Sequence, residues 1–182
     1  MSPFYFLRHG QTDWNRQRMC QGQLDIPLNT TGLEQAGTAR AILAKLPIAT
    51  ICCSPLSRAR RTAEIINEAL NCPLAIIDGL MECSFGNLEG QAFTGNTYRE
   101  IHDEALSLGA EPLDAFVERV AGAIEEALSH PGPVLIVSHG GAFWAIGQRF
   151  SLGTDEIIAN ATPVRFDPSG EEANRWSVAP IQ

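Results

Sequence analysis

The sequence lacks any block of lysine and arginine residues. Its 182 residues include 13 Lys and Arg against 21 Asp and Glu, which gives a net charge of −8 with neutral histidines. Proteins that coat DNA or RNA depend on many cationic contacts to phosphates and on the release of counterions. The charge therefore excludes a nucleic-acid-coating surface. It still allows a small anionic ligand that is held by a local cluster of Arg and His.

Long apolar runs and a disulfide framework are also absent. No stretch approaches the roughly 20 apolar residues of a membrane-spanning helix. The apolar run at 4–7 is too short for the core of a signal peptide and leads directly into Arg8 and His9. The cysteines are odd in number, which favours a reducing compartment; they are Cys20, Cys52, Cys53, Cys72 and Cys83. We therefore expect a cytoplasmic protein with neither a membrane nor a nucleic acid as partner.

No internal repeat, low-complexity tract or linker interrupts the chain. Hydrophobic residues make up 45% and charged residues 19%, as in a packed globular protein. Because domains commonly contain about 100–200 residues, we expect one domain over 1–182. The stretch 86–112 is rich in Gly, Asn, Thr and Glu and has weak periodicity. We expect it to be a variable substrate or lid loop.

Short apolar runs alternate with helical patterns. Four runs suit buried strands of a parallel sheet: 4–7, 49–53, 74–77 and 134–137. The runs at 162–166 and 174–178 predict a hairpin or two edge strands. The alternation predicts an α/β fold, a three-layer sandwich in which helices flank a mostly parallel central sheet.

Four helices are expected between these runs. A capping box at Thr31 to Glu34 predicts the start of the first, and Ser54 followed by Pro55 predicts the start of the second. An apolar stripe predicts a third helix over 113–128. A fourth follows Gly140.

Two of the four histidines occupy equivalent places. His9 and His139 each follow a predicted strand and precede a glycine. Ligands of doubly wound sheets bind beyond the carboxyl ends of the strands, so both histidines should face one crevice. Gly10 and Gly140 would let backbone N–H groups approach an anion. One such histidine alone could equally be a packing residue, but two, the first preceded by Arg8, favour a reactive site.

Arg58 is predicted in the first turn of its helix, where a cation is unfavourable unless it helps the helix N-terminus to hold an anion. Arg60 and Arg61 are expected on a solvated face. Cys52 and Arg58 share the C-x5-R spacing of cysteine-dependent phosphatases. Because Cys52 lies within a predicted strand and Pro55 occupies a segment without glycine, we interpret Cys52 as a buried structural cysteine.

Four segments, in order, resemble the landmarks of the histidine phosphatase superfamily, in its phosphoglycerate mutase-like branch. They are Leu-Arg-His-Gly-Gln-Thr-Asp-Trp-Asn at 7–15, Ser-Pro-Leu onward at 54–63, Glu82 with Phe-Gly-Asn-Leu-Glu-Gly at 85–90, and Ser-His-Gly-Gly at 138–141. The segment 21–29 also resembles the family's Gly-x-x-Asp-x-Pro-Leu turn. The resemblance covers most of the chain.

The resemblance implies a phosphomonoesterase that acts on a small molecule without metal or cofactor. His9 would attack phosphorus to give a phosphohistidine, which water then hydrolyses. Arg8, Arg58 and His139 would hold the phosphoryl oxygens. Glu82 would protonate the leaving oxygen and later accept a proton from water. Further contacts to phosphate or substrate would come from Gly10, Asn15, Gln21, Gly22 and Gly140.

Several alternatives stay open. From the residues alone Glu82 has rivals in Asp78 and Glu89, and only its match to the family's acid selects it. Arg99 is the only Arg or Lys in 86–112, and Cys-Ser-Phe-Gly at 83–86 replaces the mutases' Arg-His-Tyr-Gly. These features favour water as acceptor and a likeness to α-ribazole and broad-specificity phosphatases. A mutase-type phosphotransferase and a non-catalytic phosphate-binding module remain alternatives, and a homodimer is among the open oligomeric states.

Overall fold

The computed structural model describes residues 2–94, 97–150, 152, 158–169 and 176–181. The side chains at 98 and 99 also lie outside the described part, so the prediction made on Arg99 does too. Gly170 and the first residues of the predicted strand at 174–178 also lie outside the described part of the chain.

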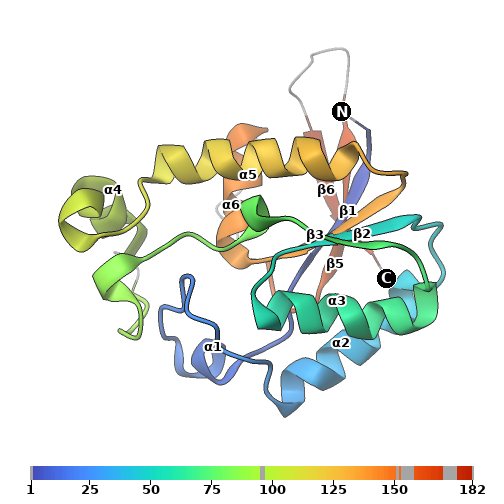
Figure 1. Cartoon of the computed structure of the whole chain (residues 1–182), viewed down its shortest axis with the longest axis horizontal. Coiled ribbons are helices and arrows are strands. Elements are labelled where there is room, and N and C mark those ends of the chain that lie inside the picture. Colours follow the sequence, from blue (N-terminus) through green and yellow to red (C-terminus); the bar gives the residue numbers. More distant parts are fainter. Residues whose placement is uncertain (1, 95–96, 151, 153–157, 170–175, 182) are drawn as a thin grey trace.

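One mixed sheet forms the middle layer (Figure 1). Its strands are β1 (Phe4–Arg8), β2 (Thr50–Cys53), β3 (Leu74–Ile76), β4 (Val134–Ser138), β5 (Pro163–Pro168) and β6 (Trp176–Pro180). The order across the sheet is β3-β2-β4-β1-β5-β6. Neighbours from β3 to β1 are parallel, whereas β5 and β6 are antiparallel to their neighbours. The predicted α/β fold and its four parallel strands are confirmed. Of the two alternatives for the last two strands, the structure shows the hairpin: β5 pairs with β1 and β6, and only β6 lies at an edge.

Helices cover both faces of the sheet. They are α1 (Asp13–Gln17), α2 (Thr30–Leu43), α3 (Ser57–Leu70), α4 (Thr97–Leu108), α5 (Leu113–Leu128) and α6 (Gly140–Arg149), with 3-10 turns η1 (Asp78–Leu80) and η2 (Gly86–Leu88). Figure 1 shows α2 and α3 on one face and α5 and α6 on the other, with α1 and α4 beyond one end of the sheet. In the described segments no helix is both long enough and apolar enough to cross a membrane.

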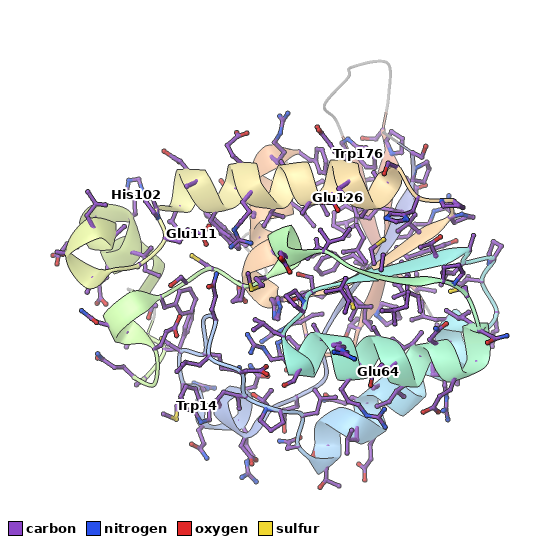
Figure 2. The ribbon with its side chains drawn as sticks, viewed as in Figure 1. Trp14, Glu64, His102, Glu111, Glu126 and Trp176 are labelled. Atoms are coloured by element: carbon purple, nitrogen blue, oxygen red, sulfur yellow. The ribbon has the colours of Figure 1, made fainter. Side chains whose placement is uncertain are left out.

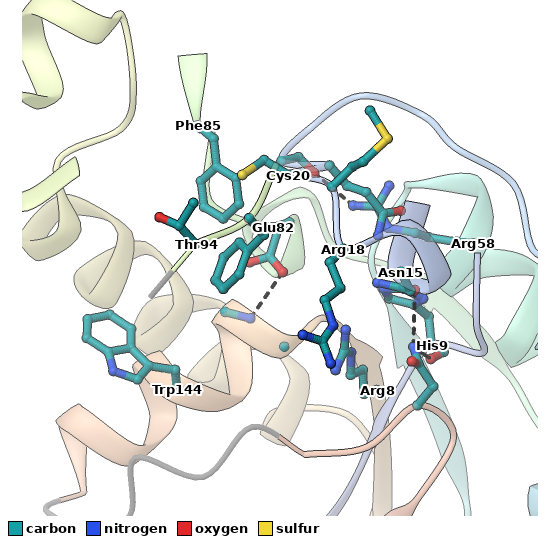
Figure 3. A pocket seen from close by; sticks show the side chains of 17 residues that line it. Arg8, His9, Asn15, Arg18, Cys20, Arg58, Glu82, Phe85, Thr94 and Trp144 are labelled. Atoms are coloured by element: carbon teal, nitrogen blue, oxygen red, sulfur yellow. Dashed lines mark hydrogen bonds between the residues drawn. The ribbon is translucent and has the colours of Figure 1, made fainter. Parts of the chain in front are cut away.

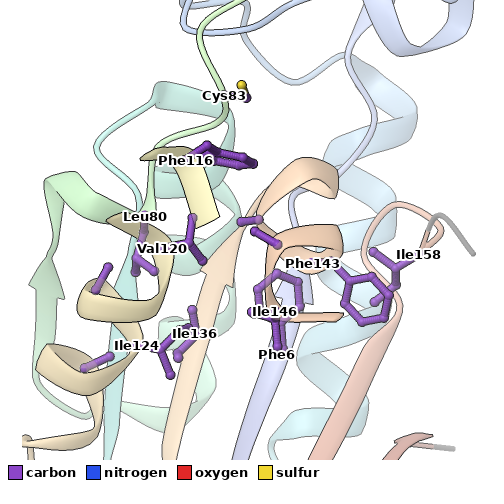
Figure 4. Packing of buried hydrophobic residues seen from close by; sticks show 14 of the residues in the cluster. Phe6, Leu80, Cys83, Phe116, Val120, Ile124, Ile136, Phe143, Ile146 and Ile158 are labelled. Carbon is purple, nitrogen blue, oxygen red and sulfur yellow. The ribbon is translucent and has the colours of Figure 1, made fainter. Parts of the chain in front are cut away.

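Alternating strand side chains build a core on each side of the sheet. Phe6 and Ile136 belong to the cluster that packs under α5 and α6, where Figure 4 shows Ile124 and Ile146 facing them. Leu7 and Val137, the next residues on β1 and β4, belong to the cluster under α2 and α3. Both clusters contain side chains with no exposed surface. The strand ends are thus anchored on both faces.

Both predicted helix starts are displaced. α2 begins at Thr30, because Asn29 is the cap and its side chain accepts a hydrogen bond from Gly32 N at 2.8 Å. α3 begins at Ser57 after Leu56, and no side chain caps it. The hydroxyl of Ser54 is instead engaged with His139. The capping interpretation of Ser54 was therefore wrong, and that residue belongs to the site described below.

The segment 86–112 is more regular than predicted, since it contains η2 and the whole of α4. Among the side chains of α4 that the structure describes, Thr97, Ile101 and Ala105 are buried, and Leu106 is 90% exposed. Glu104 interrupts the helix with φ −133° and ψ 21°. A helix with two buried apolar positions among those described and one break gives a hydrophobic periodicity that is too weak to detect in the sequence. Whether the segment closes on a ligand stays a prediction.

Candidate active site

The sheet order brings three sequence-distant segments together. β2, β4 and β1 are neighbours and parallel, so the residues that follow them meet at one edge. A cavity of about 770 Å³ opens there (Figure 3). Most of the predicted site residues line it, namely Arg8, His9, Asn15, Gln21, Gly22, Arg58, Glu82 and Gly140. His139 and Gly10 are not among the lining residues.

His9 is buried and its ring is oriented by its own turn. Nδ1 lies 2.6 Å from the carbonyl oxygen of Gly10, which can only accept a hydrogen bond. Nδ1 therefore carries the proton, and Nε2 keeps its lone pair. The Gly10 amide donates to Thr62 Oγ1 at 3.1 Å, so it is already bonded and not free for an anion. Gly10 thus orients His9, which differs from the predicted substrate contact.

Arg58 is a nearly fully buried cation, 1% exposed. Its two terminal nitrogens donate to the carbonyls of Leu24 and Gly22 at 2.8 and 2.7 Å. Its Nε has no hydrogen-bond partner in the described part of the chain. Burial lowers the pKa of Arg58 to about 10, against the opposing influence of Glu82, so the group stays charged at neutral pH. A buried cation with an unused donor is a binding group for an anion.

Arg8, Asn15 and Gln21 complete the polar side of the cavity. Arg8 donates to the carbonyl of Ile158 at 2.8 Å, which fixes its guanidinium at the end of β1. The Oδ1 of Asn15 accepts from Thr12 N at 3.1 Å, and Gln21 Oε1 accepts from Thr12 Oγ1 at 2.9 Å. Because Thr12 occupies both amide oxygens, the amide NH2 groups of Asn15 and Gln21 are left as donors for a ligand.

The ring of His139 contacts the ring of His9, and the two ring centroids lie 5.2 Å apart. Its Nε2 lies 2.8 Å from Ser54 Oγ, and that oxygen accepts from Leu56 N at 3.3 Å. Ser54 is fully buried, and within the described part of the chain Nε2 is the only acceptor near its hydroxyl; a hydroxyl proton donated to Nε2 places the ring proton on Nδ1. Nδ1 has no partner among the described residues. His139 is therefore a neutral donor whose tautomer is set by Ser54.

Replacing Ser54 by alanine should lower kcat/KM about 3- to 10-fold, the equivalent of one hydrogen bond, because His139 is then no longer held in the donor tautomer. Ser54→Thr keeps the hydroxyl and should restore most of the activity. ¹⁵N NMR of the His139 ring gives an independent readout. An Nδ1-protonated tautomer that persists in Ser54→Ala would contradict this role.

Burial also governs the charge of both histidines. Burial first, and then the charges of Arg58 and Arg8, hold the pKa of His9 well below its ordinary value of 6.5. Burial, Arg58 and His9 do the same for the pKa of His139. Both rings are therefore neutral at physiological pH. One is prepared to act as a nucleophile and the other as a hydrogen-bond donor.

Glu82 lies across the cavity from His9 (Figure 3). One carboxylate oxygen accepts from Gly141 N at 3.0 Å and the other from Cys83 N at 2.9 Å. A Cβ on Gly141 would collide with Glu82 Oε1, so this approach requires glycine. The structure thus favours Glu82 over Asp78 and Glu89, neither of which lines the cavity.

Arg119 of α5 holds the Glu82 loop in place. It donates to the carbonyls of Gly79, Met81 and Glu82 at 2.9, 3.0 and 3.2 Å. Its charge is balanced by Glu111 at 2.7 Å. Glu89 supports the same loop, because its Oε1 accepts from the backbone of Phe85 and Gln23 at 3.1 and 3.0 Å.

Cys52 does not line the cavity, whereas Cys20 does, and burial raises the pKa of the Cys20 thiol above its ordinary value. Cys52 is fully buried, and burial raises the pKa of its thiol to about 12. The structural interpretation of Cys52 is therefore supported. In the described residues no group of three or more His, Cys, Asp or Glu is arranged to hold a metal ion. Arg60 and Arg61 are exposed, as expected, and both pair with Glu64, which Figure 2 labels on α3.

Sequence reasoning missed several residues of the cavity. Asn160 donates to the carbonyl of His9 at 2.9 Å, but nothing in its local pattern marks it. Phe85, Phe93 and Trp144 also line the cavity, although they pack in or against the hydrophobic core as well. Trp144 could have been found, because it follows Gly140 by four positions and so shares its helix face. Arg18 also lines the cavity.

Comparisons with known proteins agree with this geometry. The family model described as "Histidine phosphatase superfamily (branch 1)" matches residues 4–169. A Bacillus subtilis protein named "Uncharacterized phosphatase PhoE" is 38% identical over 159 residues, which cover 86% of this chain and 81% of that protein. The "Probable phosphoglycerate mutase GpmB" of Salmonella paratyphi A is 34% identical over 151 residues, or 77% of this chain and 70% of that one.

Solved structures show the same fold. A mycobacterial glucosyl-3-phosphoglycerate phosphatase, solved in complex with VO3, superposes with a TM-score of 0.80 at 25% identity, over 98% of this chain and 97% of that one. The family match covers every segment that contributes to the cavity, from Arg8 to Asn160. The chain belongs to branch 1 of the histidine phosphatase superfamily.

Proposed function

We propose that the protein hydrolyses a small phosphomonoester through a phosphohistidine intermediate on His9. The observation that carries this proposal is the bond from His9 Nδ1 to the Gly10 carbonyl, which leaves an unprotonated Nε2 between two arginines at the cavity. A neutral imidazole nitrogen is a nucleophile at neutral pH, and it needs no base to activate it.

In the first half-reaction, Nε2 attacks phosphorus as the P–O bond to the leaving group breaks. Arg58, Arg8 and His139 Nδ1 donate to the equatorial oxygens and offset their charge. Glu82, protonated at this stage, gives its proton to the leaving oxygen. The products of this step are a phosphohistidine, a free alcohol and a Glu82 carboxylate.

In the second half-reaction, the Glu82 carboxylate accepts a proton from a water molecule. The water oxygen bonds to phosphorus as the N–P bond breaks. Inorganic phosphate leaves, and both His9 and Glu82 return to their starting states. Every proton is accounted for by these two residues, so no further co-reactant is required.

Rapid quenching during turnover of a ³²P-labelled phosphomonoester tests the proposal. Wild type should yield a protein adduct that is labile in acid and stable in base, as a phosphoramidate is. The adduct should be absent from His9→Ala and present in Cys52→Ser. An adduct that survives in His9→Ala and vanishes in Cys52→Ser would overturn the assignment in favour of the thiolate.

The same quenched samples distinguish a hydrolase from a mutase-type phosphotransferase. Addition of phosphoglycerate should leave the yield of inorganic phosphate unchanged. Transfer of label to phosphoglycerate without release of phosphate would favour the mutase. No adduct with any ester, together with tight binding of phosphate, would favour a binding module.

A further inference from the structure

Arg18 is a cation of the cavity that the mechanism above does not use. It follows α1 in the left-handed conformation with φ 55° and is exposed at the cavity mouth. Its backbone is tied down on both sides, because its N–H donates to Asn15 O at 3.1 Å and its carbonyl accepts from Phe93 N at 2.7 Å. The side chain thus projects from a fixed backbone.

Arg18 has no carboxylate partner in the described part of the chain, although acidic residues outnumber basic ones. Six other described arginines do form such pairs, namely Arg16, Arg40, Arg60, Arg61, Arg119 and Arg165. In a chain of net charge −8, Arg58 shares with Arg18 the lack of an ion pair among the described residues, but Arg58 already has a role in the proposed mechanism and Arg18 does not. The charge is available to a ligand.

Arg18 and Arg8 extend their guanidinium groups toward the same part of the cavity (Figure 3). Two like charges that share a partly desolvated space repel each other, and an anion between them removes that repulsion. The transferred phosphoryl group already has Arg58 and His139 at the bottom of the cavity, where His9 is 2% exposed. An exposed arginine at the mouth therefore lies nearer to the leaving group.

The side of the cavity away from the arginines carries aromatic rings beside Glu82 and Thr94. Phe85 and Phe93 form a ring pair with centroids 6.4 Å apart, and both line the cavity together with Trp144. Figure 3 shows Phe85 and Trp144 across the cavity from Arg18. A leaving group between these walls would meet aromatic rings on one side and a cation on the other.

We infer that Arg18 binds a second anionic group on the leaving side of the substrate. The substrate class is a phosphomonoester whose leaving group combines an apolar or aromatic body with a carboxylate or a second phosphate. This inference rests on the proposed function for the identity of the first phosphate. It makes Arg18 a specificity-determining residue and not a contributor to phosphoryl transfer itself.

Binding of non-hydrolysable probes tests the inference apart from catalysis. Benzylphosphonate and 4-carboxybenzylphosphonate differ only in the second anion, and calorimetry at low ionic strength gives the affinity of each. Wild type should prefer the carboxylated probe about 5- to 20-fold, as expected for one charge-assisted bond at a partly exposed site. A probe with a second phosphonate in place of the carboxylate shows which anion is preferred.

Arg18→Gln removes the charge and keeps most of the side chain. This variant should therefore bind the two phosphonate probes with about equal affinity. Arg18→Gly, which suits the left-handed backbone, should do the same. The matched control is Arg16→Gln, because Arg16 belongs to the same turn but is exposed and pairs with Asp13 at 3.1 Å. This control should keep the wild-type preference.

Two outcomes would overturn the inference. Equal loss of affinity for both probes in Arg18→Gln would assign Arg18 to the first phosphate, and an unchanged preference would show that Arg18 contacts neither group. Hydrolysis of phenyl phosphate is measured in parallel. Selective probe binding without any hydrolysis would leave the inference standing and contradict the proposed function instead.

Discussion

His9→Ala is expected to lower kcat/KM for any phosphomonoester on the order of 10⁴-fold or more. Loss of a nucleophile removes the covalent route entirely, and the remaining groups catalyse only through binding and charge stabilisation. Arg58 and Glu82 stay in place in this variant, so affinity for inorganic phosphate should change little. Initial rates with 4-nitrophenyl phosphate, together with phosphate binding by calorimetry, separate these two effects.

His102→Ala is the matched control for this experiment. His102 is exposed on α4 and does not line the cavity (Figure 2). Its replacement should leave the rate unchanged. A His9→Ala enzyme that retains more than about a tenth of the wild-type rate would show that another group is the nucleophile.

The pH dependence follows from the same residue. Attack needs neutral His9, whose pKa is held below 6.5 by burial and by Arg58 and Arg8. A lowered pKa means that protonation, and loss of activity, begins only at a more acidic pH than for an ordinary histidine. The acid limb of kcat/KM, which reports the free enzyme, should therefore lie below pH 6.5. A limb above that value would contradict the neutral resting state.

Much of the scaffold could be predicted because its signals are local. Runs such as 134–137 are apolar and fully buried on both faces, which is the pattern that identifies a central parallel strand. The proximity of His9 and His139 could also be inferred, because each follows a predicted parallel strand and the carboxyl ends of such strands lie at the same edge of the sheet. The helix Leu113–Leu128 matches its prediction to the residue, because its apolar stripe is continuous.

The errors arise where a side chain is engaged by a partner distant in sequence. Ser54 has the sequence context of a helix cap, but 85 positions separate it from His139, the residue that it contacts. Gly10 was predicted to offer its amide to an anion, yet Thr62 of α3 occupies that amide. No periodicity or local motif encodes such contacts. They follow only from the packing of α3 against the strand ends.

Arg18 and the aromatic residues that line the cavity, Phe85, Phe93 and Trp144, were missed for a different reason. Substrate-contacting residues at the mouth of a cavity need no period and bury little surface, so hydrophobic patterning carries no information about them. Arg18 is exposed, and Phe93 comes from the segment 86–112, in which the periodicity is weak. The residues that we propose to bind the phosphate could be predicted from the sequence, whereas those that we propose to select the leaving group required the structure.

Glu82→Gln should reduce kcat roughly 10²- to 10⁴-fold for an alkyl phosphate, because glutamine cannot protonate the alkoxide that leaves. The loss should be much smaller for the first half-reaction of 4-nitrophenyl phosphate, whose leaving group is stable without a proton. Rapid-mixing measurements of the nitrophenolate burst isolate that half-reaction. Hydrolysis of the phosphohistidine, which needs Glu82 as a base, should then become rate-limiting, so the labelled adduct should accumulate.

Glu89→Gln supplies the matched control, because Glu89 is a carboxylate of the same loop that accepts backbone hydrogen bonds but does not line the cavity. Any loss in that variant should come from displacement of the loop and should affect the alkyl and the nitrophenyl ester equally. A leaving-group dependence confined to Glu82→Gln would assign proton transfer to Glu82 specifically. Equal losses of rate for the alkyl and the nitrophenyl ester in Glu82→Gln would contradict a role in proton transfer. Glu82 would then be a positioning residue that acts through the amides of Gly141 and Cys83.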